Sequence, residues 1–100
     1  MLTGRQKRFL RALGHNLKPV LQIGKKELDV GLIAEADAAL AHHELIKVRV
    51  QEGCLLDRGE AAEALAAACG AQVAQLLGRT FLLYRQAEEP RLALPAVGED

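Results

Sequence analysis

Seven basic residues precede the first acidic residue of this 100-residue chain. From Glu27 onward, thirteen acidic residues stand against six basic ones, so a chain of zero formal net charge is divided into a cationic opening and an anionic remainder. Charge segregation of this kind predicts a surface that meets an anionic partner, and a polyphosphate is the leading candidate. The seven opening cations are Arg5, Lys7, Arg8, Arg11, Lys18, Lys25 and Lys26.

Two other groups of residues could do chemistry, but a structural interpretation is favoured for both. Adjacent helical residues point about 100° apart, so His42, His43 and Glu44 are not expected to converge on a metal and are instead expected to end a helix. Cys54 and Cys69 lack C-x-x-C spacing and a His or Asp partner for nucleophilic catalysis, so two unpaired thiols are expected. We therefore expect no metal, no cofactor, no small-molecule substrate and no enzymatic activity.

Composition indicates one compact domain with an aliphatic core. Half of the residues are hydrophobic, and only Phe9, Phe81 and Tyr84 are aromatic. The last two are expected to pack in the core, which leaves few platforms on which unpaired bases could stack. Neither a signal peptide nor an apolar run of about 18 residues is present, so a cytoplasmic monomer without membrane contact is expected.

The first helix is predicted to carry most of the opening cations. Thr3 and Gln6 have the spacing of a capping box, and Gly14 is expected to end the helix. At about 100° per residue, the helix has an apolar arc opposite a cationic one. The apolar arc contains Phe9, Leu10, Ala12 and Leu13, and the cationic arc contains Lys7, Arg8 and Arg11.

A short strand and a basic turn follow this helix. The pair Lys18-Pro19 favours extended backbone over residues 20–23, and Gly24-Lys25-Lys26 is the predicted turn after it. A basic helix face, a lysine before the strand and a lysine pair after it can together neutralise phosphates. A merely solvated helix face is the alternative, and the absence of acidic residues over the first 26 positions favours phosphate binding.

The rest of the chain predicts two more helices and three more strands. Asp29 is a candidate N-cap for a helix that runs to about His42. Asp57 and Glu60 form a capping pair for an Ala-rich helix that ends at Gly70. Strands are predicted over 45–50, 72–77 and 80–85, with Gly78-Arg79 as a hairpin turn. In the strand over 45–50, Lys47 and Arg49 project from the face opposite to the core, where solvent contact is favoured over ligand contact.

These elements give an α+β (α/β) fold in the order α-β-α-β-α-β-β. Helices are expected to cover a four-stranded mixed sheet that ends in an antiparallel hairpin. The residues after Arg85 are charged and include Pro90, Pro95 and Gly98. They predict an extended or flexible C-terminal tail over 87–100.

Four segments, in this order and spacing, resemble a known family. They are Leu17-Lys18-Pro19-Val20, Gly24-Lys25-Lys26, Ala41-His42-His43-Glu44-Leu45-Ile46-Lys47-Val48 and Gly78-Arg79-Thr80-Phe81-Leu82-Leu83-Tyr84-Arg85. Together they resemble the bacterial YhbY-type stand-alone CRM domain, the chloroplast RNA splicing and ribosome maturation module, from about Thr3 to Arg85.

The resemblance implies an RNA-binding domain over residues 1–86, similar in fold to the C-terminal domain of bacterial translation initiation factor three. It also implies association with precursors of the large ribosomal subunit and no catalysis. The family's turn after the first strand usually reads G-x-x-G and is likened to the backbone-clamping loop of KH domains. Glu27 occupies the fourth position here, which removes a conformationally permissive residue and adds a charge that repels phosphate.

The predicted RNA contacts combine this resemblance with the charge pattern. Structured RNA, read by shape, suits a charge-rich and aromatic-poor surface better than a stacked single strand does. The alternative function is a protein-interaction module whose basic half docks on an acidic protein partner. The candidate contacts are Arg5, Lys7, Arg8, Arg11, Lys18, Gly24, Lys25, Lys26, Lys47, Arg49 and Arg79.

Overall fold

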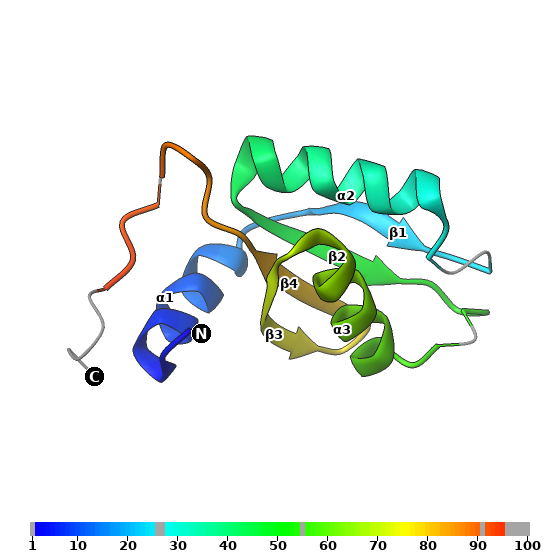
Figure 1. Cartoon of the computed structure of the whole chain (residues 1–100). Helices are drawn as coiled ribbons and strands as arrows, with labels where there is room; N and C mark the ends of the chain where they lie inside the picture. The colour runs from blue at the N-terminus through cyan, green and yellow to red at the C-terminus, as the bar shows by residue number, and fades with distance from the viewer. Residues whose placement is uncertain (1, 26–27, 55, 91, 96–100) are drawn as a thin grey trace.

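The computed structural model describes residues 2–25, 28–54, 56–90 and 92–95 (Figure 1). Within these residues the chain forms helices and strands in the predicted order, which confirms the α+β fold. The elements are α1 (Gly4–Gly14), β1 (Pro19–Ile23), α2 (Val30–His43), β2 (Leu45–Val50), α3 (Arg58–Cys69), β3 (Gln72–Leu77) and β4 (Thr80–Tyr84). The similarity to initiation factor three remains a prediction.

The four strands form one mixed sheet in the order β1-β2-β4-β3. β1 runs parallel to β2, while β4 is antiparallel to both β2 and β3. The β3–β4 hairpin closes through two residues, and the first of them, Gly78, has a φ of +59°. Glycine tolerates this backbone better than any residue with a side chain, which explains the predicted turn.

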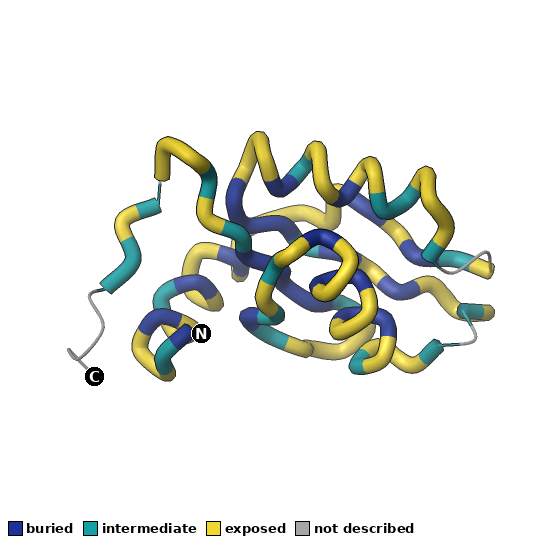
Figure 2. Tube along the Cα trace, in the orientation of Figure 1, coloured by how far each residue is buried: buried dark blue, intermediate teal, exposed yellow. Residues whose placement is uncertain are grey.

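The two faces of the sheet are covered to different extents. α2 and α3 pack on one face over a core that includes Ile23, Val48 and Phe81. α1 packs on the opposite face against Leu45, Leu82 and the neighbouring strand β3, near one end of the sheet (Figures 1 and 2). Because successive side chains of a strand alternate between faces, the side chains of Lys47 and Arg49 share the face of Leu45, on which α1 lies.

The buried stripe of α1 differs from the prediction. Gln6, Leu10 and Gly14 are buried at intervals of four residues, whereas Ala12 and Leu13 are exposed. The predicted apolar arc was therefore wrong at its last two members. The reason is a close approach at Gly14, where an added Cβ would lie 2.4 Å from Cδ1 of Leu82, so the glycine side of the helix turns toward the sheet.

The helix ends follow the predicted capping chemistry. The Thr3 hydroxyl accepts from the Gln6 backbone N–H at 3.1 Å, and the Gln6 side chain accepts from the Thr3 N–H at 3.0 Å, which confirms the capping box. Asp29 caps α2, and Asp57 accepts from the Glu60 backbone N–H at 2.8 Å to cap α3. That hydrogen bond is the main reason why the pKa of Asp57 is lowered. Gly70 ends α3 in the left-handed conformation, as predicted.

The junction between α2 and β2 contains an unpredicted feature. His42 and His43 occupy the last turn of α2, as expected, and Glu44 is the C-cap. Glu44 is fully buried and has a φ of +62°. Its backbone carbonyl accepts from the Arg85 N–H at 2.9 Å, so this junction is fixed to the end of β4.

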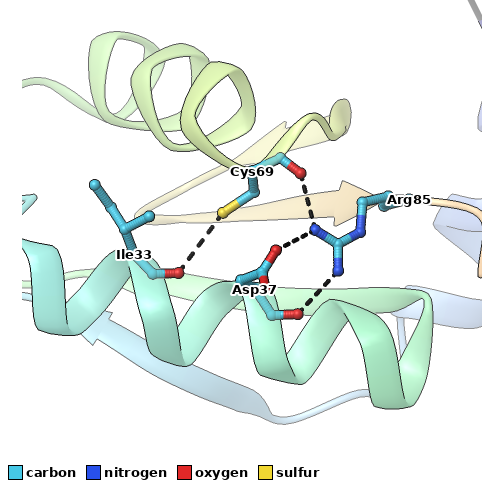
Figure 3. A network of polar contacts seen from close by, with 4 residues as sticks. All are labelled: Ile33, Asp37, Cys69 and Arg85. Atoms are coloured by element: carbon cyan, nitrogen blue, oxygen red, sulfur yellow. Dashed lines mark hydrogen bonds and ion pairs between the residues drawn. The ribbon is translucent and has the colours of Figure 1, made fainter.

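Arg85 joins α2 to α3 (Figure 3). Its Nη1 donates to Oδ1 of Asp37 at 2.5 Å and to the carbonyl of Cys69 at 2.9 Å, while Nη2 donates to the carbonyl of Asp37 at 2.9 Å. Residue 85 lies just beyond β4, so the predicted last strand was one residue too long. Cys69 is buried beneath this network and is a free thiol, as is Cys54.

The chain after β4 crosses back to α1. Residues 86–95, apart from the undescribed position 91, form neither helix nor strand. Leu92 and Leu94 pack against the cluster of Leu2 and Leu10, and Nε2 of Gln6 donates to the carbonyl of Pro95 at 2.8 Å. This segment therefore contributes to holding α1 on the sheet (Figure 1).

Candidate nucleic-acid interface

α1 carries four of the predicted contacts on its outer surface. Arg5, Lys7, Arg8 and Arg11 are all exposed, and the helix contains no acidic residue. The opposite stripe is fixed to the sheet by Leu10 and Gly14, and Leu2 N donates to Oε1 of Gln72 on β3 at 2.8 Å. These contacts present the four cations on a helix of defined orientation.

Lys18 and Lys47 meet at a groove beside α1. Pro19 lies opposite Lys47 in the β1–β2 register, which places the exposed Lys18 next to the half-buried Lys47. Both lysines line a cavity of about 430 Å³ whose other walls are mainly aliphatic. The lining residues are Leu13, Leu17, Lys18, Val20, His43, Leu45, Ile46, Lys47 and Leu92.

A second group of cations lies at the far end of the sheet. Gly24 is half-buried in the turn after β1, and the Lys25 side chain lies against Gly53, where a Cβ would come within 3.7 Å of its Cε. Arg79 in the hairpin turn is exposed, and its Nη2 lies 3.6 Å from Oε1 of Glu52. An ion pair this exposed is weak, so it only partly neutralises Arg79. Lys26 and Glu27 lie outside the described residues, so the predicted effect of Glu27 on the turn stays a prediction.

Arg49 connects the two groups across the open sheet face. It is exposed, as expected for this strand position, and stands between Gln22 of β1 and Thr80 of β4 in the sheet register. Lys47 and Arg49 project on the face where α1 lies. They therefore lie between this helix and the far turns, which are the turn after β1 and the β3–β4 hairpin turn.

Tyr84 and Phe81 do not contribute to this surface. Phe81 is 1% exposed and Tyr84 is 4% exposed, which confirms that both pack in the core. Burial and, secondarily, the carboxylate of Glu44 raise the pKa of Tyr84. Burial and then Asp37 raise the pKa of the Cys69 thiol, while Arg85 opposes this shift. A raised pKa keeps Cys69 as a poorly nucleophilic thiol.

Neither a metal site nor a membrane helix is found in the part of the chain that the structure describes. No three His, Cys, Asp or Glu side chains there are grouped so that they could hold a metal ion. None of its helices combines the length and apolar character needed to cross a bilayer.

Comparison with known proteins identifies the family. The model of the CRS1 / YhbY (CRM) domain matches residues 2–85. The chain belongs to the CRM domain family.

Individual relatives span nearly the whole chain. It is 43% identical over 89 residues to Probable RNA-binding protein YqeI of Bacillus subtilis, an alignment that covers 89% of this chain and 93% of the relative. It is 38% identical over 94 residues to an RNA-binding protein of Haemophilus influenzae, covering 94% of this chain and 95% of that one.

A solved structure agrees with this assignment. The solution structure of the hypothetical protein SAV1595 from Staphylococcus aureus, which has been suggested to bind RNA, superposes with a TM-score of 0.80 at 41% identity. The match covers 95% of this chain and 100% of that one.

The surface of this CRM domain is suited to bind the backbone of a polyanion. Its cations are lysines and arginines on α1, on the open sheet face and on turns, where each can approach a separate phosphate. The described basic residues lie on several elements at fixed positions, so they favour a partner of defined shape over a flexible chain.

Proposed function

We propose that this protein is a non-catalytic RNA-binding protein that holds structured RNA through its phosphates. The observation that carries the proposal is the basic outer surface of α1, a helix without acidic residues whose other side is fixed to the sheet. Lys18, Lys25 and the β2 cations extend that surface. The names of the relatives from B. subtilis and H. influenzae support RNA as the partner.

We further propose that the RNA is ribosomal and belongs to precursors of the large subunit. The support for this finer statement is family membership together with a surface suited to folded RNA. The protein would act there as a cytoplasmic monomer without cofactor, and phosphate contacts would supply most of its affinity.

Sedimentation of cell extracts tests the proposal. A variant with Lys7→Glu, Arg11→Glu and Lys25→Glu should no longer sediment with large-subunit precursors. Each substitution replaces a cation that attracts a phosphate with a carboxylate that repels it. Glu63→Lys on the exposed face of α3 is the control and should comigrate as the wild type does.

Ribonuclease separates RNA from a protein partner. The wild type should be released from those fractions by ribonuclease and by high salt. Release by salt with retention after ribonuclease would favour an acidic protein partner, and unchanged comigration of the triple variant would contradict the proposal.

A further inference from the structure

The groove between α1, β1 and β2 is lined by both aliphatic and cationic side chains. Leu13, Leu17, Val20 and Leu45 supply an aliphatic surface, and Lys18 and Lys47 supply two cations. No acidic side chain is found among the described residues that line it. An occupant that matches both parts has an apolar face attached to an anion.

Three of the aliphatic side chains that line the groove are exposed to solvent. Val20 is 50% exposed, and Leu17 and Leu13 are 37% and 39% exposed. Leu21 and Ile23 belong to the core under α2 and α3. Because side chains alternate along a strand, Val20 lies on the opposite face of β1, where it lines the groove.

From these features we infer that the groove receives one unpaired nucleobase of the bound RNA, with Lys18 and Lys47 on the phosphates that flank it. This inference rests on the proposed RNA binding. A cavity of about 430 Å³ is near the lower end of the range of about 300–1,000 Å³ for ligand pockets, which suits a single nucleotide.

The position of the groove supports this occupant over a free small molecule. Leu13 belongs to α1, and Lys18 follows it in the connection to β1, so the groove opens beside the basic helix. An RNA backbone held by α1 would therefore pass its mouth. Flipped bases pack against apolar as well as aromatic side chains, so the scarcity of exposed aromatic residues does not prevent it.

The groove also refines the kind of RNA. A regular duplex presents no free base, whereas a bulge or loop can turn one outward. The phosphate contacts of α1 and the far turns fit a folded RNA, and the groove adds one unpaired position at a fixed distance from them. His43 at the groove supplies a polar ring that can bond the edge of the base.

Binding of two RNA hairpins tests the inference. One hairpin is fully paired, and the other is identical except for one unpaired adenosine, which is replaced by 2-aminopurine for fluorescence. The wild type should prefer the bulged hairpin by about fivefold or more, the ratio expected from burial of roughly 40 Å² of apolar surface at about 25 cal/mol per Å². The fluorescence of the 2-aminopurine should change on binding.

Matched variants locate the effect. Leu17→Gln with Val20→Thr makes two of the aliphatic wall residues polar without a change of charge. It should strongly reduce the preference while leaving affinity for the paired hairpin unaltered. Leu77→Gln with Val30→Thr makes the same two replacements at exposed positions outside the groove, which are 61% and 84% exposed, and should keep the preference.

The outcomes separate the two proposals. If the wild type binds both hairpins equally, or if the groove variant retains the preference, the groove is not a base site while RNA binding stands. If the wild type binds neither hairpin, RNA binding and the base site fall together. Methyl resonances of Leu17 and Val20 that shift with the bulged hairpin alone would support the inference.

Discussion

Tyr84 is the only tyrosine of a chain without tryptophan, so its ionisation can be followed without interference. Its hydroxyl is buried, and no described residue forms a hydrogen bond with it. Burial and then Glu44 raise the pKa of Tyr84 above its usual value of 10.0. The near-ultraviolet absorbance of tyrosinate should therefore titrate at higher pH in the folded protein than in denaturant.

This shift makes a signed prediction about stability. The folded state holds the phenolic proton of Tyr84 more tightly than the unfolded state does. The contribution of this group to the free energy of unfolding is therefore complete below the unfolded pKa of about 10 and is lost as pH rises through the folded pKa. Tyr84→Phe should remove this part of the loss of stability at high pH. Denaturation curves of the variant and the wild type, compared at several pH values, measure the difference.

The same substitution tests the hydrogen bonding of the hydroxyl. A buried hydroxyl without a partner costs free energy, so Tyr84→Phe should leave the free energy of unfolding at neutral pH unchanged or raise it by up to about 1 kcal/mol. A loss larger than about 1 kcal/mol would instead show that the hydroxyl has a stabilising partner.

Sequence reasoning was reliable for residues whose role follows from local chemistry. The caps at Thr3, Asp29 and Asp57 were predictable because each needs only a side chain and a backbone N–H three residues later. The burial of Glu44 was not predictable, since a carboxylate is rarely buried and nothing local requires it. The groove was also missed, because Leu17, Val20 and Lys47 meet only after β1 pairs with β2.

At the scale of elements, the docking of α1 depends on one glycine. An added Cβ at Gly14 would lie 2.4 Å from Cδ1 and 3.2 Å from Cγ of Leu82, which is itself buried. Gly14→Ala should therefore lower the free energy of unfolding by about 1–3 kcal/mol, as overpacked cores do. Denaturant unfolding measures the change.

Gly31 provides a control of opposite sign. It lies in the first turn of α2, where an added Cβ would meet only Oδ1 of Asp29 at 3.5 Å. Gly31→Ala should raise the free energy of unfolding by about 0.4–1 kcal/mol, because alanine restricts the unfolded chain. Equal effects of the two substitutions would mean that α1 does not approach the sheet this closely.

The link between α2 and α3 gives a second prediction at this scale. Arg85→Ala removes three hydrogen bonds, two to Asp37 and one to Cys69, and should lower the free energy of unfolding by about 1–3 kcal/mol. Its affinity for RNA should not change in conditions where the protein remains folded.

Arg49→Ala is the matched control for Arg85→Ala. Arg49 is exposed on the sheet face, so its replacement should change the free energy of unfolding by no more than about 0.5 kcal/mol while weakening RNA binding. Paired denaturation and binding measurements would contradict these assignments if Arg85 affected binding alone or Arg49 affected stability alone.

Element order was predictable because caps, periodicity and turn residues agreed along the chain. The orientation of α1 about its own axis was not, since hydrophobicity favoured Ala12 and Leu13 over Gln6 and Gly14. Tertiary contacts decided it: Gly14 permits close approach to Leu82, and Gln6 donates to Pro95 in the tail. Neither partner is adjacent in sequence.

At the scale of the whole molecule, a net charge of zero does not prevent binding to a polyanion if the charges are placed apart. With four or five phosphate contacts, the logarithm of the binding constant should fall against the logarithm of salt concentration with a slope of about −3 to −4. The slope depends on the number of phosphates that the protein contacts and not on its net charge. It therefore tests whether the cations of α1 lie at the RNA.

Two variants with the same net charge should therefore behave differently. Lys7→Gln with Arg11→Gln removes two charges from the outer surface of α1 and should make the slope shallower by about 1.5, since each phosphate contributes about 0.7–0.9. Ala67→Glu with Ala68→Glu changes the net charge equally at exposed positions of α3 and should leave the slope near that of the wild type. Equal shallowing in both variants would mean that the overall charge governs binding. A change confined to the α1 variant would mean that this helix contacts the phosphates.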